Sequence, residues 1–187
     1  MIQRVVVFAA LGAVLALPAG RARADEAGLG VGEPHHQFAA YGILGLGIPV
    51  GSYGVEAVLR LAPAFEISAG VGVGMTALIA RSGSPLQWAV MPRVRAGKDE
   101  RNTFTLGIGA SGGNVGEIPL FCDCDTSPTY PTHYWLWTNV EAGGEHWWRN
   151  NIALRYFAGV AVGCRTDAGC NSVIGYPYTG VGIGRAF

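Results

Sequence analysis

Hydrophobic and polar residues alternate with a period of two along most of the chain after residue 34. Residues 53–63 show this most clearly, because Val55 and Leu59 fall on one face while Glu56 and Arg60 fall on the other. Such alternation is typical of β-strands. The pattern recurs at 64–76, 85–97, 103–111, 133–143 and 151–163, and more weakly at 36–48 and 179–187. The sequence therefore predicts an all-β fold with eight strands of roughly ten residues each.

The connections between these strands differ in length at the two ends. Strands two and three are joined by little more than Pro63, strands four and five by "GKDERN", and strands six and seven by "GEHWWRN". Two long connections, 112–133 and 164–178, fall at the opposite end, together with residues 81–85 and the short "PVGS". Short turns at one end and long loops at the other are typical of an up-and-down transmembrane β-barrel. We therefore expect an eight-stranded antiparallel barrel whose short turns and termini face the periplasm.

The first residues have the features of an export signal. Arg4 precedes an apolar run that is too short to span a bilayer as a helix, and Ala22-Arg23-Ala24 is a small-x-small cleavage site. We expect residues 1–24 to be a cleaved signal peptide, 25–34 a short N-terminal segment and 35–187 the barrel, placed in the outer membrane of a Gram-negative bacterium. Cleavage would leave 10 Lys and Arg against 13 Asp and Glu, a net charge of −3. Without a basic stripe, nucleic-acid binding is not expected.

The two faces of the predicted strands differ in charge. The apolar face carries no Asp, Glu, Lys or Arg across strands two to seven, whereas the glycine-rich face carries Glu56, Arg60, Glu66, Arg93, Arg95, Glu141 and Arg155. A soluble barrel of this size would not bury so many charges inside, and its exterior would be a continuous apolar band. Because eight strands leave an interior that side chains just fill, we expect these residues to form a charged network that plugs the lumen. A pore for small solutes is the alternative.

Aromatic residues on the apolar face are expected at both membrane interfaces. The outer group is Tyr53, Trp88 and Tyr134, and the periplasmic group is Phe65 and Phe104 with the turn residues Trp147 and Trp148.

The eight alternating segments and the final "GVGIGRAF" resemble the small outer-membrane barrels typified by the OmpA transmembrane domain and OmpX. In that family the terminal aromatic and alternate apolar residues are read by the barrel-assembly machinery, which implies that Val181, Ile183 and Phe187 act as an assembly signal. Arg185 stands where a second apolar residue is usual. Either it snorkels to the headgroups or the register shifts near the terminus.

The four cysteines, Cys122, Cys124, Cys164 and Cys170, all fall at the long-loop end. In an exported protein they are disulfide candidates, and their spacing fits a zinc site poorly, so no metal is expected. Cys164 with Cys170 is the simplest pairing, and cross-links between the two loops are the alternative.

Candidate catalytic groups are few. The spacing of Gly107, Gly109 and Gly112 matches a dinucleotide fingerprint, but no helical pattern follows it, so no cofactor is expected. His35, His36 and His146 fall away from the outer rim, which leaves His133, with Asp125 and Ser127 as conceivable partners.

Together these features predict a monomeric, non-enzymatic outer-membrane barrel with a structural or surface-interaction role. Its expected partners are outer-membrane lipid and lipopolysaccharide, the assembly machinery, and an extracellular ligand bound through loops 112–133 and 164–178. A lipid A-modifying enzyme and, less favoured, a soluble secreted binding barrel are the alternatives.

Overall fold

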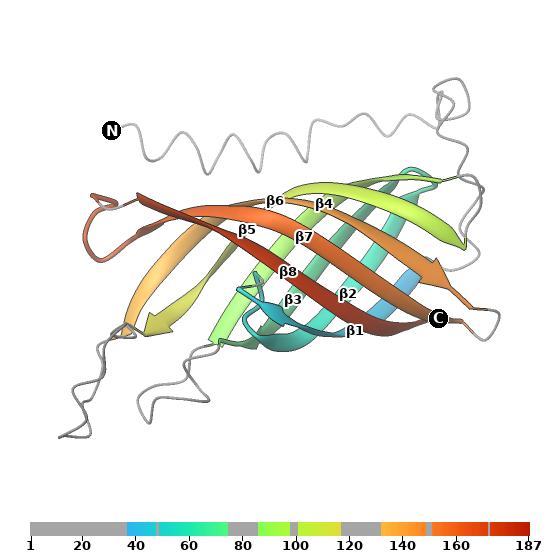
Figure 1. Cartoon of the computed structure of the whole chain (residues 1–187), viewed down its shortest axis with the longest axis horizontal. Coiled ribbons are helices and arrows are strands. Elements are labelled where there is room, and N and C mark those ends of the chain that lie inside the picture. The colour runs from blue at the N-terminus through green and yellow to red at the C-terminus, as the bar shows by residue number, and fades with distance from the viewer. Residues whose placement is uncertain are drawn as a thin grey trace.

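The chain forms a closed barrel of eight antiparallel strands in sequence order, as a computed structural model shows (Figure 1). The structure describes residues 37–47, 49–74, 86–97, 101–116, 132–148, 151–171 and 173–187. The strands are β1 (Phe38–Leu46), β2 (Tyr53–Ala62), β3 (Phe65–Val73), β4 (Leu86–Ala96), β5 (Asn102–Gly116), β6 (Thr132–Trp147), β7 (Ile152–Arg165) and β8 (Val173–Ala186). The described part contains no helix that is long and apolar enough to cross a membrane. The predicted fold class is confirmed.

Closure of the sheet depends on the pairing of β8 with β1. Their register runs from Ala39 opposite Ala186 to Leu46 opposite Thr179. The backbone N–H of Phe187 donates to the carbonyl of Phe38 at 3.0 Å. Pairing of the first strand with the last leaves the sheet without an open edge, which a barrel in lipid requires.

The register of β8 is unbroken as far as Ala186. Arg185 lies opposite Ala40 of β1 and Ile152 of β7, and its side chain is exposed on the outer face. The alternative of a register shift near the terminus is therefore wrong, and the outward position is the one from which an arginine can snorkel.

The two faces of the sheet differ as the alternation predicts. Large apolar side chains are exposed on the outside, as Leu46 at 64% and Ile183 at 66% illustrate, whereas Val58 and Arg155 inside the barrel are almost completely buried. Among the described strands, Arg185 is the one outward-facing residue that is Asp, Glu, Lys or Arg. The barrel is therefore apolar outside and charged inside.

Several strands are longer than the sequence predicts, which corrects the bounds of both long loops. β5 runs to Gly116 and β6 starts at Thr132, and residues 117–131 between them lie outside the described part. Most of the predicted loop 164–178 is strand, because β7 ends at Arg165 and β8 begins at Val173. Proline is uncommon inside strands, so Pro177 did not predict one. On the N-terminal side of Thr179, however, β8 has no partner on β1, and an unpaired strand edge tolerates proline.

Aromatic residues lie on the outer face near both ends. At the loop end, where β5 finishes and β6 starts, Nε1 of Trp88 donates to the hydroxyl of Tyr134 at 2.9 Å. At the turn end, where β8 finishes, Trp148 is 47% exposed. The prediction that Trp147 is a turn residue at the periplasmic interface is wrong, because β6 continues through Trp147 and its side chain is buried inside the barrel.

Candidate functional site

Among the residues that the structure describes, the lumen holds eight buried charged side chains, four arginines and four glutamates, so their formal charges cancel. They are Glu56, Arg60, Glu66, Arg93, Arg95, Glu141, Glu145 and Arg155. Seven are the residues that the sequence predicts for the lumen, and the structure places all of them inside. The eighth, Glu145, was missed because the Gly143-Gly144 pair before it resembles a turn.

These two glycines are needed for packing rather than for a turn. A Cβ on Gly144 would lie 2.4 Å from the hydroxyl of Tyr156, and one on Gly143 would lie 2.6 Å from the carbonyl oxygen of Tyr156. β6 therefore stays extended past both positions, and the alternation carries Glu145 to the inner face.

Four of the charges form a central ring, defined as Glu56 (β2), Arg93 (β4), Glu141 (β6) and Arg155 (β7). Glu56 Oε1 lies 2.8 Å from Arg93 Nη1 and 2.7 Å from Arg155 Nη1. Glu141 Oε1 lies 3.0 Å from Arg93 Nε and 3.1 Å from Arg155 Nη2. Each carboxylate thus bridges both arginines and closes the ring.

The other four charges form a turn-side ring, defined as Arg60 (β2), Glu66 (β3), Arg95 (β4) and Glu145 (β6). Glu145 Oε2 lies 3.0 Å from Arg60 Nη2 and 3.6 Å from Arg95 Nη2. Glu66 Oε2 lies 3.2 Å from Arg95 Nε and 3.9 Å from Arg60 Nε. This ring also alternates in sign and has no net charge.

Neutral side chains add hydrogen bonds to several groups of both rings. The Tyr41 hydroxyl and Trp147 Nε1 both donate to Glu145, the latter at 2.6 Å. In the central ring, Arg93 donates to the Ser68 hydroxyl at 2.5 Å. Buried charges are tolerated only when ion pairs and hydrogen bonds replace their lost hydration. Glu56, Glu141 and Glu145 have both, whereas the buried carboxylate of Glu66 has ion pairs with Arg95 and Arg60 but no hydrogen bond.

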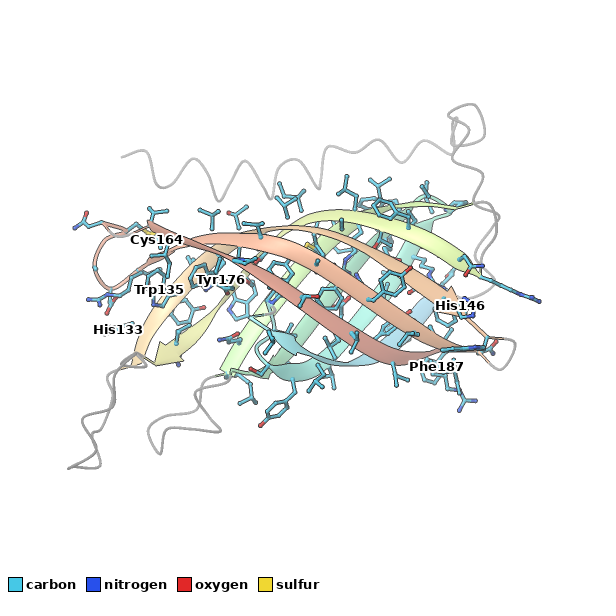
Figure 2. The ribbon with its side chains drawn as sticks, viewed as in Figure 1. His133, Trp135, His146, Cys164, Tyr176 and Phe187 are labelled. Atoms are coloured by element: carbon cyan, nitrogen blue, oxygen red, sulfur yellow. A yellow bond between two sulfur atoms is a disulfide. The ribbon has the colours of Figure 1, made fainter. Side chains whose placement is uncertain are left out.

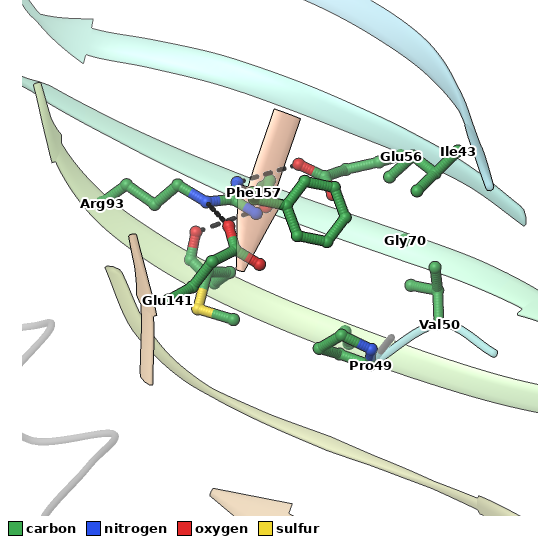
Figure 3. Close-up of a pocket in the computed structure, with 11 residues that line it drawn as sticks. Ile43, Pro49, Val50, Glu56, Gly70, Arg93, Glu141 and Phe157 are labelled. Carbon is green, nitrogen blue, oxygen red and sulfur yellow. Dashed lines mark hydrogen bonds and ion pairs between the residues drawn. The ribbon is translucent and has the colours of Figure 1, made fainter. Parts of the chain in front are cut away.

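Beyond the central ring, the short connection between β1 and β2 folds into the barrel. Pro49 and Val50 are buried, and Val50 packs over Gly54 and Gly70, where a Cβ would lie 3.2 Å and 2.7 Å from its methyl groups. Both residues line a cavity beside Glu56 and Arg93 (Figure 3). The part of this cavity that the centre of a water molecule can occupy has a volume of only about 10 Å³, which is about enough for one water.

At the loop end, aromatic residues line the inner wall, and Figure 2 shows Trp135 and Tyr176 there. We define Trp135, Trp137 and Tyr176 as the mouth cluster. The rings of Trp135 and Trp137 stack with centroids 5.0 Å apart, and Tyr176 meets Trp137 edge-on at 4.9 Å. Gly163 gives the indole room, because a Cβ there would lie 2.2 Å from Trp137 Cε3.

Polar groups border the mouth cluster, and we define His133, Arg165 and Asp167 as the rim. Nδ1 of His133 lies 2.6 Å from Asp167 Oδ2, and Arg165 Nε lies 2.9 Å from Asp167 Oδ1. The hydrogen bond to His133 holds the pKa of the exposed Asp167 carboxyl below its ordinary value, and the charge of Arg165 acts in the same direction. The carboxylate is therefore the form that this contact favours.

A disulfide joins Cys164 to Cys170 across the turn that carries Asp167. This is the simplest of the predicted pairings, whereas Cys122 and Cys124 lie outside the described residues. The backbone N–H of Thr166 also donates to the carbonyl of Tyr134 at 3.0 Å, which ties the turn to β6.

His133 contacts Asp167, which is not one of its predicted catalytic partners. Asp125 and Ser127 lie outside the described part, as do His35 and His36, and His133 pairs with Asp167. At the turn end, Nδ1 of His146 lies 2.7 Å from Asn102 Oδ1. Within the described residues no three His, Cys, Asp or Glu side chains could hold a metal ion.

The C-terminal residues Val181, Ile183 and Phe187 all have exposed side chains, those of the first two on the outer face of β8. Phe187 packs near Phe38, with ring centroids 6.0 Å apart. Its role as an assembly signal stays a prediction.

No protein-family model and no curated protein matches the sequence. A solved structure with a similar fold is the N-terminal β-barrel domain of Pseudomonas aeruginosa OprF. The match has a TM-score of 0.50 at 13% sequence identity and covers 79% of this chain and 94% of that one. The resemblance to the small eight-stranded barrels is thus confirmed as a likeness of fold.

Proposed function

We propose that this protein is an outer-membrane β-barrel with a structural or surface-interaction role, and that its lumen is closed. The distribution of charge is the observation that carries the proposal. Eight charges are buried inside, while the described outer face of the strands has the single charge of Arg185. Only a solvent of hydrocarbon makes an apolar exterior of this extent favourable.

The exterior also matches the depth profile of a bilayer. Aromatic side chains with polar atoms, such as Trp88 and Tyr134, lie exposed towards the loop end, and the exposed Trp148 and Phe187 follow β6 and β8 at the turn end. Such residues favour the two interfaces of a membrane. The likeness to the OprF barrel domain supports the same placement through the fold.

Closure of the lumen is supported by its contents. Both rings are neutral, each arginine is engaged by glutamates, and Val50 fills the space above the central ring. A passing ion would have to separate buried pairs, which costs several kcal/mol per unpaired charge. We therefore propose a plugged barrel that presents its loop end outside the cell, rather than a pore or a catalyst.

Cell fractionation tests the location. We expect the protein to sediment with the outer membrane, to remain there after a high-salt wash, and to need detergent for extraction. Recovery of the protein in the soluble periplasmic fraction without detergent would reject the membrane placement.

A further inference from the structure

The mouth cluster places three aromatic side chains together at the loop end of the lumen. By the strand registers its three side chains lie nearer the loop end than the central ring, Phe157 and Tyr178, on the inner face of β6 and β8, and Figure 2 shows Trp135 and Tyr176 there. Trp137 is 8% exposed, whereas Trp135 and Tyr176 are only partly buried. Aromatic side chains beside a few polar groups are a common composition of small-molecule sites.

The arrangement of the rings selects among ligands. Trp137 is occupied by Trp135 on one side and by the edge contact with Tyr176, so the rings do not surround an open space as an aromatic cage for a cation would. Trp135 is the outermost of the two indoles, because β6 runs inwards from Thr132. The cluster therefore offers a flat wall rather than a cage.

The rim adds polar groups without an unbalanced charge. Arg165 lies opposite Trp135 in the β6–β7 register, and Asp167 is paired with both Arg165 and His133. Within the described residues of the rim, an organic cation would find no uncompensated carboxylate, and an anion would have to displace Asp167 from its partners. Donors and acceptors that are already balanced suit a neutral ligand with many hydroxyl groups.

The rim is also held in place before any ligand arrives. The Cys164–Cys170 disulfide closes the turn, and the N–H and hydroxyl of Thr166 both donate to the carbonyl of Tyr134, each at 3.0 Å. A site whose polar groups are already fixed loses less conformational entropy on binding.

We propose that the mouth cluster and its rim bind a neutral saccharide from outside the cell, a β-linked hexopyranose whose flat C–H face packs on Trp135. The ring hydroxyls would exchange hydrogen bonds with Asp167, Arg165 and His133. This inference names a class of ligand for the proposed surface role. It rests on the proposed function only in assuming that the loop end faces the outside of the cell.

Binding is tested with the full-length mature protein, refolded from inclusion bodies into a detergent that has no sugar headgroup, so the result does not depend on cellular location. Cellotetraose and chitotetraose are the probes, followed by tryptophan fluorescence and saturation-transfer NMR. We expect saturable binding of at least one probe, with transfer strongest at the C–H protons of one sugar face. Absence of saturable binding of both, or binding of tetramethylammonium in their place, would overturn the proposal.

Variants locate the site. We expect Trp135→Ala to weaken saccharide binding about tenfold or more, as for a buried aromatic anchor. Trp88→Phe, which changes an indole on the outer face, should leave binding unchanged. Asp167→Asn changes only the exposed rim and should also weaken binding, which keeps the test valid if Trp135→Ala does not refold. Equal binding by wild type, Trp135→Ala and Asp167→Asn would refute the site.

Discussion

The hydroxyl of Tyr41 donates a hydrogen bond to the carboxylate of Glu145, 104 residues further along the chain. Tyr41 lies on β1 and Glu145 on β6, so the bond crosses the lumen between strands that are not neighbours in the sheet. Arg60 reaches the same carboxylate from β2. With Arg95 of β4, whose Nη2 lies 3.6 Å from Glu145 Oε2, this carboxylate connects four strands at the turn end.

Removal of this carboxylate should strongly destabilise the barrel. Glu145→Ala leaves Arg60 and Arg95 buried with one glutamate between them, and the loss of one partner of a buried ion pair costs about 3–5 kcal/mol. The free energy of unfolding, measured by urea titration in lipid vesicles, checks this. Arg101→Ala, an exposed charge at the same end, should change it by less than about 0.5 kcal/mol. Equal small effects of the two variants would contradict the network.

Two glycines on neighbouring strands, Gly163 on the inner face of β7 and Gly175 on the outer face of β8, should differ in their tolerance of a methyl group. A Cβ at Gly163 would lie 2.2 Å from Trp137 Cε3 and 2.5 Å from the carbonyl oxygen of Leu136, whereas one at Gly175 would meet nothing closer than 3.6 Å. We expect Gly163→Ala to destabilise the barrel by about 1–3 kcal/mol and to shift the fluorescence of Trp137. Gly175→Ala is the control. Tolerance of both substitutions would mean that Trp137 does not pack as described.

The titration of Asp167 should depend on its contact with His133. Because the pKa of Asp167 is lowered in the folded state, its contact with His133 stabilises the turn above the ordinary aspartate pKa. That contribution is lost as the pH falls through the lowered value. We expect His133→Ala to raise the pKa of Asp167 towards its ordinary value, as followed by carboxyl carbon NMR in micelles. His146→Ala, at the opposite end, should not; the same Asp167 titration curve in all three proteins would disprove the contact.

The wild-type barrel should not conduct ions steadily. The two neutral rings and the buried Val50 leave only about the space of one water near Glu56 and Arg93. Planar-bilayer recording with purified protein checks this, and an empty-detergent addition is its control. A steady, protein-dependent conductance would show that the lumen is open and would favour the small-solute pore.

The sequence was sufficient for the strand number, the antiparallel order and the sidedness of the strands, because an alternation of period two depends only on local backbone geometry. It was insufficient where glycine or proline occurs inside a strand. Gly143-Gly144 and Pro177 resemble turn residues. The backbone carbonyl of Tyr156 leaves no room for a Cβ at Gly143, and the Tyr156 side chain leaves none at Gly144. Pro177 is tolerated because β8 has no β1 partner on the N-terminal side of Thr179. These reasons are tertiary, so Glu145 and the true start of β8 were missed.

The pairing of His133 with Asp167 could not be predicted for a similar reason. The two residues are 34 positions apart, and their meeting depends on the length of β7 and on the turn closed by Cys164 and Cys170. The sequence did place the histidine at the loop end, which is where the structure has it (Figure 2).

The central claim is that the apolar exterior faces lipid while the lumen does not. Its most direct test uses two refolded proteins in vesicles with brominated acyl chains, one retaining only Trp88 and the other only Trp137. Trp88 is on the outer face and Trp137 is buried inside. The account predicts strong quenching of Trp88 and little quenching of Trp137. Equal quenching of the two indoles, or none of Trp88, would contradict it.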